Sequence, residues 1–102
     1  MDWYQNLYVG ETLKRKQKKM VDAVEAKKSL PGLYLIITAP DGPNQLEILE
    51  SFLYYHQIKR GRQGKIVGIA YGMEEAKEQV RRMTEDVYRE TGSVSLKAYF
   101  ER

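Results

Sequence analysis

Residues 33–39, LYLIITA, form an apolar run that ends at a Pro/Gly-rich turn over residues 40–44. Residues 65–71, KIVGIAY, form a second run of the same kind, which ends at Gly72. A strand followed by a tight turn and an amphipathic helix is typical of α/β proteins with parallel sheets. Because residues 33–39 are apolar on both faces of a strand, we expect them in the centre of a sheet that is covered by helices on both sides.

The remaining segments complete an alternating pattern of helices and strands. Apolar residues recur with helical spacing over residues 11–29, 45–59 and 74–91, and Gly92 is a suitable residue to end the last of these helices. Residues 94–100 alternate between apolar and polar side chains, which predicts a half-exposed edge strand.

These segments predict a small three-layer α/β domain with the order α-β-α-β-α-β and a three-stranded parallel sheet. Right-handed crossovers allow the strand orders 2-1-3 and 1-2-3, and the two-sided apolarity of the first strand favours 2-1-3. The helix over residues 45–59 then packs on one face, and the helices over residues 11–29 and 74–91 pack on the other. We expect one domain over residues 1–102, with residues 1–10 as an aromatic N-terminal arm.

Composition excludes several classes of protein. The chain has no cysteine, so disulfides, thiolate nucleophiles and cysteine-ligated zinc are excluded. No stretch approaches the roughly 20 apolar residues that span a bilayer, and the first residues do not resemble a signal sequence. We therefore expect a cytoplasmic protein that has no membrane partner.

A small-molecule site is one possible use of the predicted sheet. Ligands bind beyond the carboxyl ends of parallel strands, where the strand order reverses. In the 2-1-3 arrangement this point lies between two helix-opening turns, whose candidate residues are Asp41, Asn44, Gly72 and Glu74. Neither turn has the glycine and lysine pattern of a phosphate loop, so no cofactor is expected, and capped turns without a ligand remain the alternative.

A basic surface at the amino edge of the sheet is a second possible site. The loop over residues 59–65 is basic and contains two glycines but no acidic residue. With the end of the predicted helix over residues 11–29 it would form a patch of six cations: Lys27, Lys28, Lys59, Arg60, Arg62 and Lys65. A solvated loop and helix face explain these charges most simply. The alternative is contact with nucleic acid or another polyanion, which we expect to be weak and salt-sensitive.

His56 is the only histidine, and its position argues against catalysis. It falls within the apolar arc of the predicted helix over residues 45–59, so we expect it to be buried. It also lies in the last turns of that helix, away from the predicted ligand crevice, where a general base would be needed. No spacing of histidine and acidic residues resembles a metal site or a catalytic triad.

The predicted helix over residues 45–59 has an apolar arc that is wider than one sheet face requires. The arc comprises Leu46, Ile48, Leu49, Phe52, Leu53 and Tyr55. A small domain rarely exposes such a surface without a partner, which predicts a homodimer with contacts at Ile48, Phe52 and Tyr55. Crowding by the helix over residues 11–29 is the competing explanation.

Three functions are compatible with these features. A small, non-enzymatic association module, in its simplest form a homodimer, accounts best for the wide apolar arc and the absence of recognisable catalytic motifs. Anion or nucleic-acid binding by the basic patch is the alternative. An enzyme or small-molecule sensor at the carboxyl edge of the sheet ranks below both, because open α/β sheets host many functions.

Overall fold

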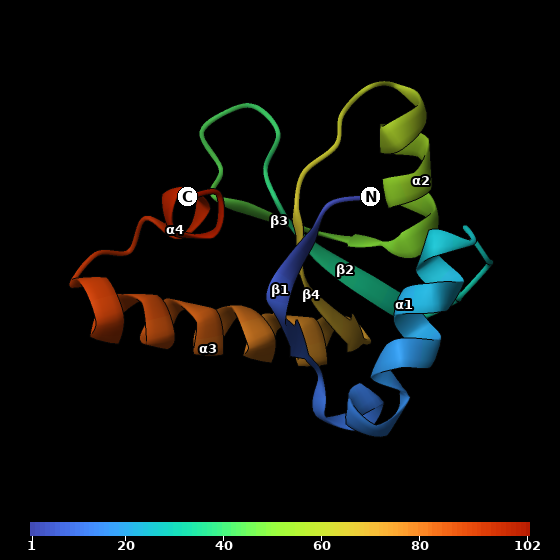
Figure 1. The fold of residues 1–102 in the computed structure, drawn as a ribbon, viewed down its shortest axis with the longest axis horizontal. Helices are drawn as coiled ribbons and strands as arrows, with labels where there is room; N and C mark the ends of the chain where they lie inside the picture. Colours follow the sequence, from blue (N-terminus) through green and yellow to red (C-terminus); the bar gives the residue numbers. More distant parts are fainter.

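Two predicted strands lie in the centre of the sheet, but the sheet is larger and mixed. The computed structural model describes residues 1–102 and contains a four-stranded sheet with the order β1-β4-β2-β3 (Figure 1). The strands are β1 (Trp3–Val9), β2 (Leu33–Thr38), β3 (Leu46–Glu50) and β4 (Ile66–Tyr71). Only β1 and β4 are parallel, since β2 is antiparallel to both β3 and β4. The expectation of a three-stranded parallel sheet is therefore wrong.

The helices lie in two layers. A 3-10 helix η1 (Glu11–Lys16) continues into α1 (Gln17–Glu25), and α2 (Ser51–Lys59), α3 (Met73–Thr91) and α4 (Leu96–Phe100) follow along the chain. The prediction for α3 is confirmed, and Gly92 ends it in the left-handed conformation with a φ of 73°. None of the helices combines the length and the apolar character needed to cross a membrane.

The first third of the predicted helix over residues 45–59 is the strand β3. Leu46 and Ile48 pack toward one face of the sheet and Leu49 toward the other, which is the two-residue alternation of a strand. Backbone pairing supplies the physical reason, because the Ala39 N–H donates to the Gln45 carbonyl and so closes an antiparallel hairpin between β2 and β3. The wide apolar arc was thus the sum of a strand and a short helix.

Residues 94–100 form the helix α4 instead of the predicted edge strand. Leu96 and Phe100 are both buried, and they lie four residues apart on one face of this short helix. Phe100 packs edge-on against Tyr4 and Tyr99, with ring centroids 4.9 and 5.2 Å away. A helix places Leu96 and Phe100 on one side, where both side chains can be buried against the sheet. Their burial explains why residues 94–100 form a helix although their sequence alternates between apolar and polar residues.

The predicted N-terminal arm is the edge strand β1. Trp3 pairs with Ile66 and Tyr8 with Gly68, so the chain advances five residues along β1 but only two along β4. This difference is a bulge, a common feature of edge strands. The Ile66 N–H also donates to the Asp2 carbonyl at 2.8 Å, which ties the start of the chain to β4.

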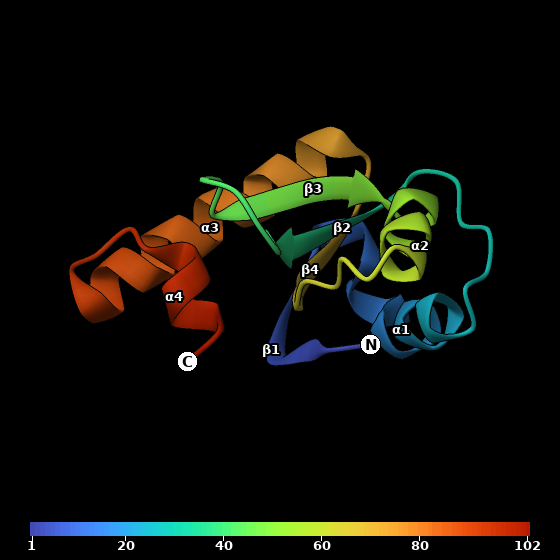
Figure 2. The ribbon, with the colours of Figure 1, turned by 90° about the horizontal axis from the view of Figure 1, so that it is seen from above.

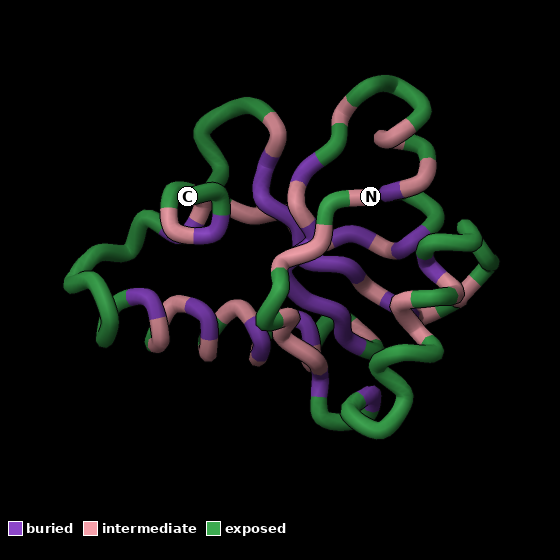
Figure 3. The backbone as a smooth tube through the Cα atoms, in the orientation of Figure 1, coloured by how far each residue is buried: buried purple, intermediate pink, exposed green.

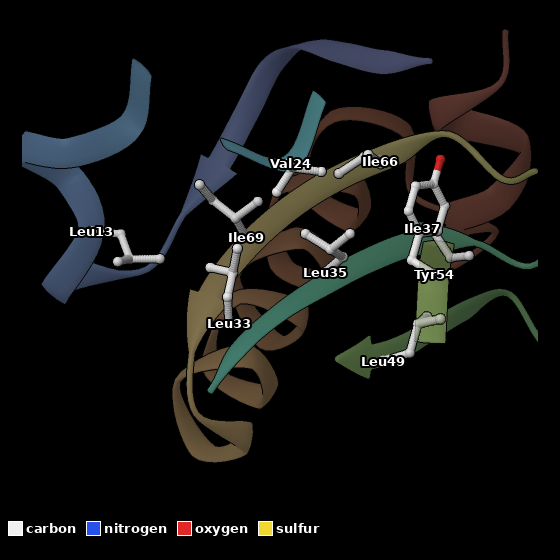
Figure 4. Close-up of a cluster of buried hydrophobic side chains, with 9 residues drawn as sticks. All are labelled: Leu13, Val24, Leu33, Leu35, Ile37, Leu49, Tyr54, Ile66 and Ile69. Carbon is white, nitrogen blue, oxygen red and sulfur yellow. The ribbon is translucent and has the colours of Figure 1, made fainter. Parts of the chain in front are cut away.

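The sheet separates two hydrophobic clusters. Leu35, Ile69 and Tyr54 belong to the cluster under η1, α1 and α2 (Figure 4). Ile36, Val67 and the buried side of α3 and α4 form the other. Figure 2 shows the two helical layers from above, and Figure 3 shows that the buried residues follow the central strands and one side of α3. η1 and α1 therefore pack on the same face of the sheet as α2. This differs from the expectation that α2 packs alone on its face.

Candidate functional site

The residues of the predicted small-molecule site lie at opposite ends of the sheet. Leu33 pairs with Tyr71, so the Gly72 turn after β4 lies beside the start of β2, whereas Asp41 follows the end of β2. The structure therefore does not bring Asp41 and Asn44 together with Gly72 and Glu74. Antiparallel pairing of β2 and β4 is the reason, because it separates the two carboxyl ends.

Asp41 instead forms part of an ion pair within the loops. The Arg62 guanidinium donates to both carboxylate oxygens of Asp41, at 3.0 and 3.1 Å, and approaches Glu47 at 3.5 Å. These hydrogen bonds lower the pKa of the Asp41 carboxyl below its ordinary value. Arg62 is thus neutralised by two carboxylates.

The predicted basic patch is divided into smaller groups. The Lys65 ammonium donates to the Phe100 carbonyl at 2.9 Å, on the side of the sheet that α4 covers. The Tyr55 hydroxyl donates to the Lys28 carbonyl, which places the backbone of Lys28 beside the middle of α2. Lys59 and Arg60, both exposed and without an ion pair, lie at the C-terminal end of that helix. The six cations therefore do not form one continuous surface.

His56 is exposed on α2, so the expectation that it is buried is wrong. The helix begins at Ser51 rather than at residue 45, and it buries Ser51 and Tyr54 toward the sheet. His56 therefore lies on the outer side, with its ring edge-on to Phe52 at a centroid distance of 6.4 Å.

The candidate self-association residues have different environments. Phe52 is 50% exposed, and the neighbouring Leu53 is 46% exposed. Ile48 is half-buried against the cluster on the α3 side, and Tyr55 is half-buried with its hydroxyl bonded to Lys28. The exposed apolar surface of α2 therefore consists of Phe52 and Leu53.

A groove that the sequence did not indicate lies between β1 and α3. It has a volume of about 790 Å³, within the range of about 300–1,000 Å³ that is typical of ligand pockets. A second hollow of about 560 Å³ shares Asn6, Tyr8, Asp86 and Arg89 with it. The two hollows form one open groove, which we call the β1–α3 groove.

The periodicity of α3 places one stripe of polar side chains in this groove. Gln79, Arg82, Asp86 and Arg89 lie at spacings of three and four residues, so they share one side of the helix. This stripe borders the buried apolar stripe that packs on the sheet. The β1–α3 groove is therefore mostly polar, and η1 adds Lys14 at one end.

Tyr8 and Asp86 connect the two walls of the groove. The Tyr8 hydroxyl donates to the Asp86 carboxylate at 2.6 Å, and Arg89 donates to the other oxygen at 3.2 Å. Burial, and then the hydrogen bond to Asp86, raises the pKa of Tyr8 above its ordinary value. The Tyr8–Asp86 hydrogen bond joins β1 to α3, and Arg89 supports Asp86 from within α3.

Gln79 is the most deeply buried polar residue of the α3 stripe that lines the groove. It is 2% exposed. Its carboxamide atoms are not among the buried side-chain atoms that lack a partner, which are Glu47 Oε1 and Gln57 Oε1. A carboxamide in this position is available to donate to a ligand and to accept from it.

The far end of the groove is aromatic. The Tyr99 hydroxyl donates to Glu90 at 2.6 Å, a hydrogen bond that raises the pKa of Tyr99 to about 12. The Arg102 guanidinium lies 4.1 Å from the centre of the Tyr99 ring and also pairs with Glu90. This end therefore offers ring surface together with fixed charges.

The lining of the β1–α3 groove contains no histidine, cysteine or serine. No group of three histidine, aspartate or glutamate residues in the chain is arranged to hold a metal ion. The one local signal for the site in the sequence was Gln79, a polar residue at the border of the apolar stripe of α3.

The chain matches no family model, and comparisons with curated proteins and with solved structures find no similar protein.

Proposed function

We propose that this chain is a non-enzymatic association module whose β1–α3 groove holds an extended polypeptide segment of a partner protein. The observation that carries the proposal is the position of Gln79, a polar residue that is 2% exposed and lines the groove. A ligand in the groove can pair with both the donor and the acceptor of its carboxamide.

The chemistry of a carboxamide favours a peptide ligand. Gln79 presents one acceptor oxygen and one donor NH₂ group, and a peptide group presents the complementary C=O and N–H. A phosphate only accepts hydrogen bonds and would leave the Gln79 oxygen without a donor. The amide therefore fits a polypeptide backbone better than a nucleic-acid backbone.

The position of β1 supports the same ligand. It is a terminal strand of the sheet, so its outer edge has no strand partner. Extended peptides commonly bind along such edges through main-chain hydrogen bonds, with side chains in adjacent hollows. The bulge between Trp3 and Tyr8 keeps this contact short, because it interrupts the regular spacing of the edge.

The test is a selection of phage-displayed random linear peptides on the immobilised full chain. Enriched peptides are synthesised and titrated calorimetrically against the wild type, Gln79→Leu and Gln63→Leu, the last being an exposed loop residue outside the groove. Because leucine is similar in size to glutamine but forms no hydrogen bonds, we expect Gln79→Leu to keep the thermal stability of the wild type and to bind the peptides more weakly by about tenfold or more.

Two results would contradict the proposed function. One is a selection that yields no binding peptide. The other is that Gln79→Leu binds the selected peptides as tightly as the wild type and Gln63→Leu do.

Self-association is a second candidate, and one observation favours it. Phe52 and Leu53 are large apolar residues that are both about half exposed at consecutive positions of α2. They follow directly after β3, the other terminal strand of the sheet. A second copy of the chain that covers them would form a homodimer away from the β1–α3 groove.

A further inference from the structure

The cations of the β1–α3 groove differ in how far they are neutralised. Arg81 contacts both Glu78 and Glu85, Arg89 pairs with Asp86 at 3.2 Å, and Lys14 pairs with Glu11 at 3.1 Å. Each of these side chains has a carboxylate partner at short range.

Arg82 is the exception. Its only ion pair is with Glu78 at 3.8 Å, and the same carboxylate oxygen is already held by Arg81. The side chain of Arg82 is 43% exposed and lines the groove three residues after Gln79, on the same side of α3. Its guanidinium therefore has donors available for a ligand in the groove.

We propose that the bound polypeptide segment carries an aspartate or glutamate side chain that pairs with Arg82, next to the peptide group that pairs with Gln79. This inference rests on the proposed function and adds the chemistry of the recognised segment. Guanidinium–carboxylate hydrogen bonds are charge-assisted, and at a partly exposed site they set the preference among partners more than the total affinity.

A nucleic-acid strand fits the groove less well. Glu85, Asp86 and Glu90 line it together with the cations, and they would repel successive phosphates. A single carboxylate needs only one cation with free hydrogen-bond donors, and Arg82, whose ion pair with Glu78 is long and shared, supplies it.

An acidic side chain also fits better than a C-terminal carboxylate. The groove continues past Arg82 in both directions, toward Lys14 at one end and toward Tyr99 at the other. A segment that runs through the groove places a side chain at Arg82, whereas a chain end would leave part of the groove empty.

The experiment repeats the peptide selection in parallel on wild type, Arg82→Gln and Arg60→Gln. Arg60 is a matched control, because it is exposed on the opposite helical layer, forms no ion pair and changes the net charge equally. We expect acidic residues at a constant position in peptides selected by wild type and Arg60→Gln, and no such preference with Arg82→Gln.

Titrations then identify the group that Arg82 recognises. One selected peptide is made in three forms: unmodified, with its acidic residue replaced by the amide isostere, and with an amidated C-terminus. The acid-to-amide change should weaken binding to wild type about tenfold and should have little effect on Arg82→Gln. Amidation of the C-terminus should leave the affinity unchanged, and added salt should weaken the acidic peptide more than its isostere.

The outcomes separate this inference from the proposed function. Peptides that depend on Gln79 but show no acidic preference would overturn the inference and leave the proposed function standing. Loss of affinity on amidation alone would assign the contact to the chain end and also overturn it. If no peptide depends on Gln79, both fail.

Discussion

At the scale of single residues, Gly64 lies against backbone that leaves no room for a side chain. A Cβ added there would lie 2.0 Å from the Thr38 carbonyl oxygen, a backbone atom that is held within the sheet. We expect Gly64→Ala to lower the free energy of unfolding by about 3 kcal/mol, as overpacking against a fixed group does. Urea denaturation followed by circular dichroism measures the change.

Gly61→Ala is the matched control for this prediction. An added Cβ at Gly61 meets no atom within 4 Å, but its φ of 77° is unfavourable for alanine. That conformation alone costs about 1–2 kcal/mol. Gly64 is not among the glycines with positive φ, so a loss for Gly64→Ala no larger than that for Gly61→Ala would show that the contact with Thr38 relaxes at little cost.

Tyr54 makes the stability of the protein sensitive to alkaline pH. Burial raises the pKa of Tyr54 from 10.0 to about 12, so on raising the pH the unfolded chain ionises before the folded one. The contribution of Tyr54 protonation to the free energy of unfolding is therefore complete below pH 10 and is lost as the pH rises toward 12. We expect the free energy of unfolding of the wild type to fall over this interval, and that of Tyr54→Phe to fall less steeply.

Tyr88→Phe serves as the control, because Tyr88 is exposed. Denaturation curves at pH 8, 10 and 11 compare the three proteins. The assignment to Tyr54 would be wrong if Tyr54→Phe loses stability with pH as steeply as the wild type and Tyr88→Phe do.

At the scale of elements, α4 depends entirely on its packing. A helix of five residues is too short to be stable in isolation, and the buried side chains of Leu96 and Phe100 hold it on the sheet. We expect Phe100→Ala to lower the free energy of unfolding by about 3–5 kcal/mol. Val94→Ala, at a residue that is 63% exposed, should change it by less than about 0.5 kcal/mol.

Urea denaturation separates these cases, and Phe100→Leu extends the series if Phe100→Ala fails to fold. A small loss for both Phe100 variants would mean that α4 does not stabilise the rest of the chain.

Long, consistent patterns predicted elements correctly, and short ones did not. The two apolar runs that became β2 and β4 bury nearly all of their side chains, and α3 repeats its apolar spacing over 19 residues. Residues 46–50 and 94–100 satisfy helical and strand spacing about equally well. Tertiary hydrogen bonds and packing decide between the two, and those contacts come from residues distant in sequence.

The candidate site could not be predicted because one of its walls was misassigned. With residues 1–10 taken as an arm, no groove beside α3 could be expected. The pairing of Trp3 and Tyr8 with Ile66 and Gly68 joins segments about 60 positions apart, and no local pattern encodes such a contact. The polar stripe of α3 was recognisable, but it is equally typical of a solvent-exposed helix face.

At the scale of the whole molecule, the exposed apolar residues of α2 predict the oligomeric state. We expect the wild type to scatter light as a dimer at micromolar concentration, with about 800 Å² buried per subunit if the interface is of standard size. Leu53→Asp should be a monomer, because it would place a charge in an apolar contact.

Val94→Asp introduces the same charge at an exposed residue outside α2 and should remain a dimer. A wild-type protein that is monomeric throughout the concentration range would eliminate self-association as a function of this surface.

The parallel pairing of β1 with β4 has a consequence for the order in which the chain folds during its synthesis. Tyr8 leaves the ribosome well before its strand partner Gly68, a delay of roughly 3–12 s at about 5–20 residues per second. The hairpin of β2 and β3 needs only neighbouring residues and can form within that interval. We therefore expect β1 to join the sheet only after β4 has left the ribosome, later than the hairpin of β2 and β3 forms. Under the proposed function, a nascent chain whose β1 is still unpaired would lack one wall of the groove, and we expect it to bind the partner segment only after β1 has joined the sheet.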